Sequence, residues 1–147
     1  MLQGTDLPEW VFRAIVQGAP EAIIMADSDG VVRLWNVGAE AMFGYTANEA
    51  IGQTLDLIIP ERQRERHWAG YRTVMQTGTS RYGQQMLAVP ALRKDGTRIS
   101  IEFHVVVLKD DADRVAGIAA IMRDVTERWE RDRGLRQQLA DLQGRPA

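Results

Sequence analysis

Cysteine is absent from this chain of 147 residues, and histidine occurs only twice. Without cysteine the chain can form no disulfide, no thiolate nucleophile, no zinc–thiolate site and no iron–sulfur cluster. Long apolar runs are also missing, so no stretch reaches membrane-spanning length, and the first residues lack the basic-then-apolar pattern of a signal peptide. Together these absences predict a cytoplasmic protein with no membrane partner.

A strong charge of either sign is absent as well, since 18 basic and 20 acidic residues give a formal net charge of -2. This balance argues against nucleic-acid binding by the segment. There is no glycine-rich phosphate loop, no Ser/His/Asp order and no kinase or cyclase signature, so we predict no enzyme here. The composition, 45% hydrophobic and 26% charged, is that of a globular protein with one domain and an appendage.

The most informative stretch is residues 91–133, which predicts strands that lead directly into a helix. Asp95-Gly96 is the strongest short-range hairpin signal, because glycine accepts the positive φ of a primed turn. Apolar and polar residues alternate over 98–107, which is typical of a strand with one buried face. Residues 115–122 are small and apolar on both faces, which predicts a central strand covered on two sides. From Thr126 onward, leucines spaced four and three apart predict a short coiled-coil helix.

The rest of the chain alternates short strands and helices. Pro90 places its strand at a sheet edge, where no ladder donor is lost. The order of elements predicts an α+β fold, a five-stranded antiparallel sheet with helices on one face. The predicted elements are helices over 7–18, 39–43, 46–52 and 61–76, and strands over 22–26, 31–35 and 82–92.

Several separate segments resemble the PAS sensory family, of the S-box type found in bacterial signalling. They are Leu34-Trp35-Asn36, residues 39–45, residues 49–52, residues 92–96 and residues 123–128. The resemblance spans residues 10–130 and implies central first and last strands, with a cavity between the sheet and its helices. It implies three parts: a helical cap (1–19), a PAS domain (20–126) and a C-terminal linker or coiled-coil helix (127–147).

The resemblance also implies a small, largely apolar ligand in that cavity. An exit helix would carry the signal, with Asp124, Val125, Thr126 and Trp129 as the relay. Some candidate cavity residues are explained equally well as ordinary core residues that contact no ligand, and Trp35 in particular can cap the core. The candidate cavity residues are Ile24, Trp35, Met42, Phe43, Ile58, His67, Tyr71, Met75, Met86, Phe103, Ile118 and Ala120.

His67 is the candidate metal ligand, because its position is similar to that of the haem-ligating histidine in PAS oxygen sensors. A neutral imidazole in an apolar pocket is a suitable axial ligand for haem iron. Those sensors carry an arginine on the facing strand, where this sequence has Leu87. Met86, as a soft sixth ligand, or Gln85 could serve in its place. The alternative is that His67 packs and hydrogen-bonds inside the fold. His104 is expected to be solvated or to face a dimer partner.

Flavin could bind only without covalent chemistry, for example by stacking on Trp35, because a light-driven photoadduct requires a cysteine. The first functional hypothesis is a PAS sensory module of a bacterial signal-transduction, two-component or transcription-regulatory protein. The second is a haem-based gas or redox sensor. The third is a ligand-free dimerisation module. A homodimer would form through the N-terminal cap, the sheet face or the C-terminal helix.

Overall fold

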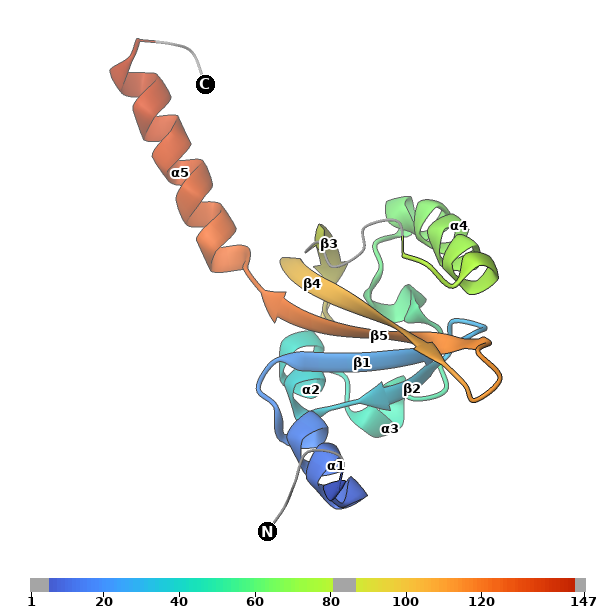
Figure 1. The fold of residues 1–147 in the computed structure, drawn as a ribbon. Coiled ribbons are helices and arrows are strands. Elements are labelled where there is room, and N and C mark those ends of the chain that lie inside the picture. The colour runs from blue at the N-terminus through green and yellow to red at the C-terminus, as the bar shows by residue number, and fades with distance from the viewer. Residues whose placement is uncertain (1–5, 81–86, 145–147) are drawn as a thin grey trace.

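The computed structural model describes residues 6–80 and 87–144, which form one sheet, the helices packed on it and a helix that extends away (Figure 1). The elements in chain order are α1 Glu9–Gly18, β1 Ala22–Asp27, β2 Val32–Trp35, α2 Val37–Phe43, α3 Ala47–Ala50, the 3-10 helix η2 Leu55–Ile58, α4 Glu61–Thr77, β3 Leu87–Leu92, β4 Arg98–Lys109, β5 Val115–Asp124 and α5 Thr126–Leu142. No helix within these described ranges is long and apolar enough to cross a membrane.

The sheet confirms the predicted fold class. Its five strands run in the order β2-β1-β5-β4-β3, and every pair is antiparallel. The first and last strands are therefore central, as expected. Pro90 lies in edge strand β3, opposite Ser100. The described part of that strand begins at Leu87, so residues 82–86 of the predicted strand lie outside the described residues.

Local capping explains why the short helices begin and end where they do. Asn36 accepts a hydrogen bond from the Ala39 amide and caps α2, and Gly44, with φ of 84°, ends that helix. Thr46 and Glu49 form the predicted capping box at the start of α3. The Asn36 cap and the capping box satisfy backbone donors at a helix start, and the Gly44 amide donates to the Glu40 carbonyl at a helix end.

Asn36 also joins three elements, because it is the one buried polar residue in the core of the described chain. Its Oδ1 accepts from the amides of Ile23 and Ala39, at 2.8 and 2.9 Å. Its Nδ2 donates to backbone carbonyls at the end of α1 and the start of β1, including Val16 and Glu21. A buried polar group is tolerated only when it is bonded in this way.

Helices cover one face of the sheet in the described chain. The expectation that residues 115–122 are covered on two sides is therefore wrong for these residues: on the opposite face, Ile121 is 37% exposed. Val106, on neighbouring β4, faces the same way and is 46% exposed. Both terminal helices also lack buried residues, and α1 exposes 67% of Trp10.

Candidate functional site

The face of the sheet that carries the helices, its inner face, has one tightly packed half. Trp35 and Phe43 are 2% and 0% exposed, with ring centroids 5.5 Å apart. The Trp35 indole donates to the Tyr45 carbonyl at 2.9 Å. We call this the closed half; its buried residues are Ala22, Ile24, Val32, Trp35, Ala39, Phe43, Ala50, Ile58, Ala91, Ile99, Ile101 and Met122.

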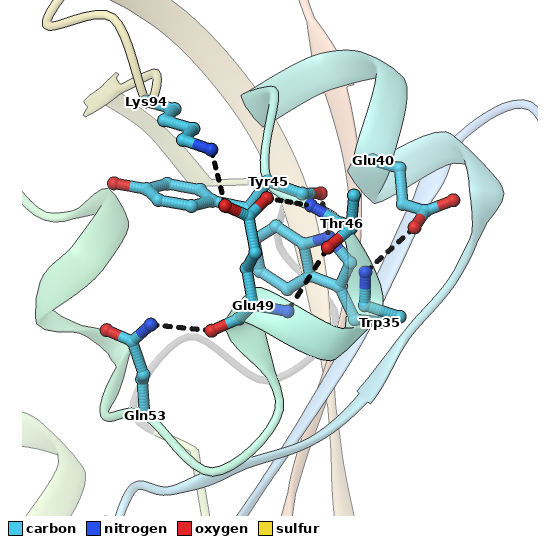
Figure 2. Close-up of polar contacts among 8 residues, drawn as sticks. Trp35, Glu40, Tyr45, Thr46, Glu49, Gln53 and Lys94 are labelled. Atoms are coloured by element: carbon cyan, nitrogen blue, oxygen red, sulfur yellow. Dashed lines mark hydrogen bonds and ion pairs between the residues drawn. The ribbon is translucent and has the colours of Figure 1, made fainter.

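A polar clasp holds the closed half from outside, as Figure 2 shows. Glu49 completes the capping box and forms an ion pair with Lys94, which extends from the β3–β4 turn. The Lys94 amide donates to the Phe43 carbonyl, and its ammonium lies over the Tyr45 ring. The clasp therefore ties α2 and α3 to the far hairpin, and its chemistry is structural.

The second half of the inner face lies toward α4, and we call it the open half. Five inward-facing apolar residues of β4 and β5 are only partly buried there: Phe103, Val105, Val107, Ile118 and Ala120. A hollow lies at the edge of β4 beside the end of α4, lined by Gly78, Thr79, Ser80 and His104–Val107, of which Val105 and Val107 face inward and His104 and Val106 face outward. Apolar surface beside an opening is what a small-molecule site requires.

Two aromatic side chains attach α4 to the β1–β2 hairpin and η2. The Trp68 indole donates to the Asp56 carboxylate at 2.7 Å, and its ring lies against Gly30. Tyr71 is buried and donates to the backbone carbonyls of Ala26 and Asp27. Burial, followed by the nearby negative charges of Asp27 and Asp29, raises the pKa of Tyr71 to about 12.

His67 lies on α4, next to Trp68 and about one turn before Tyr71. Its ring meets Trp68 edge to face, with centroids 4.7 Å apart, and lies 5.8 Å from the Tyr71 ring. Burial lowers its pKa, although the Asp56 carboxylate acts in the opposite direction. Its Nδ1 is buried and has no hydrogen-bond partner among the described residues. The residue packs as one hypothesis expected, but this nitrogen does not hydrogen-bond.

The predicted cavity residues are divided between the two halves. Ile24, Trp35, Phe43 and Ile58 belong to the closed half, and Met42 packs against it. Phe103, Ile118 and Ala120 form the sheet side of the open half, although Phe103 and Ala120 also pack against the closed half. Tyr71 and the partly buried His67 and Met75 are on α4. Met86 lies outside the described residues.

Gln63 was missed by the sequence analysis. Its Oε1 is buried without a hydrogen-bond partner in the described chain, as is His67 Nδ1. Gln63 and His67 are four residues apart on α4, so they share a helix face. That spacing from His67 was the available signal, but a polar side chain did not suggest an inward position.

The predicted relay residues Asp124, Val125 and Thr126 meet at the β5–α5 junction. The Asp124 carboxylate accepts from the Thr126 amide and hydroxyl, at 2.9 and 2.6 Å. The Thr126 hydroxyl accepts from the Ser100 amide at 2.9 Å, and the Val125 amide donates to the Ser100 carbonyl. Ser100, on β4, was not predicted as part of this junction.

The outer side of the junction includes a further ion pair, between Arg128 and Glu102. Trp129, the fourth predicted relay residue, is half exposed, and Arg136 stacks over its ring. His104, on the outer sheet face, is partly buried opposite Ile121. No group of three or more potential metal ligands occurs within residues 6–80 and 87–144.

Comparison with known proteins identifies the architecture. The family model described as the PAS fold matches residues 11–125. The sensor protein FixL of Bradyrhizobium diazoefficiens is 28% identical over 133 residues, which are 88% of this chain and 25% of FixL. The oxygen sensor protein DosP of Escherichia coli is 28% identical over 115 residues, which are 78% of this chain and 14% of DosP.

A solved structure agrees with these relatives. The PAS domain of a protein from Colwellia psychrerythraea superposes with a TM-score of 0.70 and 25% identity, over 82% of this chain and 99% of that one. The chain spans a quarter or less of the length of FixL and DosP. The match to the family model covers most of the chain and includes all five strands, so this protein belongs to the PAS family.

Proposed function

We propose that this PAS domain is the sensory module of a bacterial signal-transduction or transcription-regulatory protein. It binds a small, largely apolar molecule between α4 and the sheet. The observation that carries this proposal is the contrast between two sets of inward-facing side chains. Those under α2 and α3 are buried, whereas Phe103, Val105 and Ile118 are only partly buried, and Val105 lines a hollow beside the end of α4.

The relay would use β5, because this strand passes through both halves and leads directly into α5. Ile118 and Ala120 face the open half, and the same strand ends at Asp124, where Thr126 is bonded to Ser100. A ligand shifts such a system only if it binds two sheet–helix arrangements with different affinity. Thr126→Val removes the two bonds of the hydroxyl, to the Ser100 amide and the Asp124 carboxylate, so we expect faster hydrogen exchange at the start of α5.

A neutral fluorescent dye, N-phenyl-1-naphthylamine, tests the binding site. We expect its emission to rise and saturate at one dye per chain. Ala120→Phe, which fills the open half, should weaken binding by roughly tenfold. Ala119→Phe is the matched control, because the neighbouring residue faces the opposite side of the sheet. Dye emission that does not saturate, or that both variants reduce equally, contradicts the proposed site.

A haem sensor is the second candidate, and His67 is the observation that favours it. Burial lowers its pKa and so favours the neutral imidazole that iron ligation requires. The similarity to DosP, which is named an oxygen sensor, points the same way. When bound, haem would supply reversible gas or redox chemistry, with His67 as its axial ligand.

An absorption spectrum with added haemin distinguishes the two candidates. A Soret band that sharpens with haemin and disappears in His67→Ala would establish the haem sensor. His104→Ala, which removes the chain's other histidine, should leave that band unchanged. A spectrum that remains that of free haemin would contradict the haem sensor, and His67 would then belong to the apolar-ligand site.

Dimerisation is the third candidate, and it is compatible with either ligand. Exposed apolar side chains occur on α1, on the outer sheet face and on α5, where Leu135 and Leu139 are both more than half exposed. We expect a homodimer that buries some of this surface. Light scattering of Ile121→Glu, Phe12→Glu and Leu139→Glu would identify which surface pairs, and a wild-type monomer would contradict the proposal.

A further inference from the structure

The inward side of α4 presents two polar atoms whose hydrogen-bonding capacity is unused. Gln63 Oε1 and His67 Nδ1 are both buried without partners in the described chain. The helix advances about 6 Å over four residues and turns by roughly 40° more than one full circle, so the two side chains are neighbours. Tyr71 continues this line for one more turn, and its hydroxyl bonds to β1. The line of residues 63, 67 and 71 therefore faces inward.

The other polar groups around this line already have partners. The Trp68 indole is bonded to Asp56, and the Arg64 guanidinium donates to the carbonyls of Ile59 and Asp56. A third buried atom without a partner, Arg93 Nε, belongs to the β3–β4 turn beside the clasp. Buried polar groups in folded proteins are nearly always bonded, so a pair on one helix face calls for an explanation.

The chemistry of the two atoms indicates which group would supply their missing hydrogen bonds. Gln63 Oε1 only accepts, and a neutral imidazole can donate from Nδ1 while Nε2 carries no proton. A single group that both donates and accepts, such as a hydroxyl, would bond to both atoms. The Asp56 carboxylate is close enough to act electrostatically on His67, and Arg64 is already bonded, so a carboxylate ligand is disfavoured.

We propose that the open half selects an uncharged apolar molecule bearing a hydroxyl group. The hydroxyl donates to Gln63 Oε1 and accepts from His67 Nδ1–H. The hydrocarbon body covers the partly exposed inner-face residues of β4 and β5. This inference rests on the proposed ligand-binding function and adds the chemical class of the ligand.

Three compounds with the same ring system test the selection: 2-naphthol, naphthalene and 2-naphthoate, each competing with N-phenyl-1-naphthylamine at pH 7.5. We expect 2-naphthol to bind at least about tenfold more tightly than naphthalene, the ratio for one good hydrogen bond, and 2-naphthoate to bind most weakly. Gln63→Leu and His67→Phe keep similar volume and remove the polar atoms. In both variants the preference should fall to about twofold or less.

Gln76→Leu is the matched control, because Gln76 is an exposed glutamine on the same helix. It should leave the preference for 2-naphthol unchanged. The two test variants should fold at least as stably as the wild type, since each replaces an unpaired buried polar atom with an apolar one. If one of them fails to fold, the other still decides the question.

The possible failures are distinguishable. If the dye binds but 2-naphthol and naphthalene compete equally, the site stands and the hydroxyl selection is overturned. If the preference for 2-naphthol persists in both Gln63→Leu and His67→Phe, these two residues do not select the hydroxyl and the proposal is overturned. If neither dye nor competitor binds, the proposed function fails as well. A haemin Soret band that depends on His67 also overturns the inference, because the imidazole then serves the iron.

Discussion

The closed and open halves of the inner sheet face share strands but differ in how their side chains are covered. Met122 is 6% exposed in the closed half, whereas Ala120 and Ile118, two and four residues earlier on the same strand, are only partly buried. In the closed half the polar groups of Asn36 and Trp35 are bonded. In the open half Gln63 and His67 each keep a buried atom unpaired.

This difference has a physical origin in how the helices are attached. Small residues such as Ala39 and Ala50 let α2 and α3 approach the sheet closely, and both residues are fully buried. α4 is attached mainly through the larger side chains Trp68 and Tyr71 at the β1–β2 hairpin. The comparison teaches that one half packs its apolar side chains closely, while the other leaves its inward-facing apolar side chains only partly buried.

The largest expected effect comes from opening the closed half. Trp35→Ala removes a buried ring together with its contact to Phe43 and its bond to Tyr45, so we expect a loss of about 3 to 5 kcal/mol in the free energy of unfolding. Phe103→Ala, in the open half, should cost only about 1 to 2 kcal/mol, because less apolar area returns to water. Urea denaturation measures both, and equal losses would contradict the division into halves.

The second effect detaches α4 from its hairpin. Gly30 has a φ of 78°, and a Cβ there would overlap the Trp68 ring. Gly30→Ala therefore combines a left-handed backbone penalty with overpacking, and we expect a loss of about 2 to 4 kcal/mol. Gly52→Ala is the control, because its φ is also positive but no atom lies near a Cβ there. A loss no larger than that of the control would show that Trp68 moves aside freely.

The third effect uses pH to break the Tyr71 anchor. Its folded pKa of about 12 lies above the ordinary value of 10, so its contribution is fully present below pH 10 and is lost as pH rises toward 12. This difference between the folded and the ordinary pKa corresponds to about 2 to 3 kcal/mol in the free energy of unfolding. Melting temperatures between pH 9 and 12 should fall more steeply for the wild type than for Tyr71→Phe, and parallel curves would exclude this role.

The smallest expected effect is the pH dependence of stability caused by His67, which tests the burial of this residue beside the open half. Burial lowers the pKa of His67 in the folded chain below the ordinary value of 6.5, so the folded state is favoured when the pH is above 6.5. This contribution is lost as pH falls below 6.5, because the unfolded chain then binds the proton more readily. His67→Phe should reduce the loss of stability between pH 7.5 and 5.5. His104→Phe is the control, and an unchanged pH profile in His67→Phe would contradict the assignment.

Features that depend on neighbouring residues were predictable from sequence. The Asp95-Gly96 turn, the Asn36 cap and the Thr46–Glu49 capping box all occur as expected, because each is made by residues within a few positions of one another. The alternation over β4 also predicted its inner face. Pro90 predicted an edge strand, since a central strand needs the amide that proline lacks.

The sequence by itself determined the order of elements and the antiparallel sheet, and it predicted a candidate site of mostly apolar residues. Only the tertiary structure decided which of those residues are sealed in the core and which stay partly exposed beside α4. It also decided that Gln63 faces inward and that the outer face of β5 is uncovered in the described chain. The reason is that burial depends on which distant helix packs on a strand, and how closely, which periodicity within the strand does not encode.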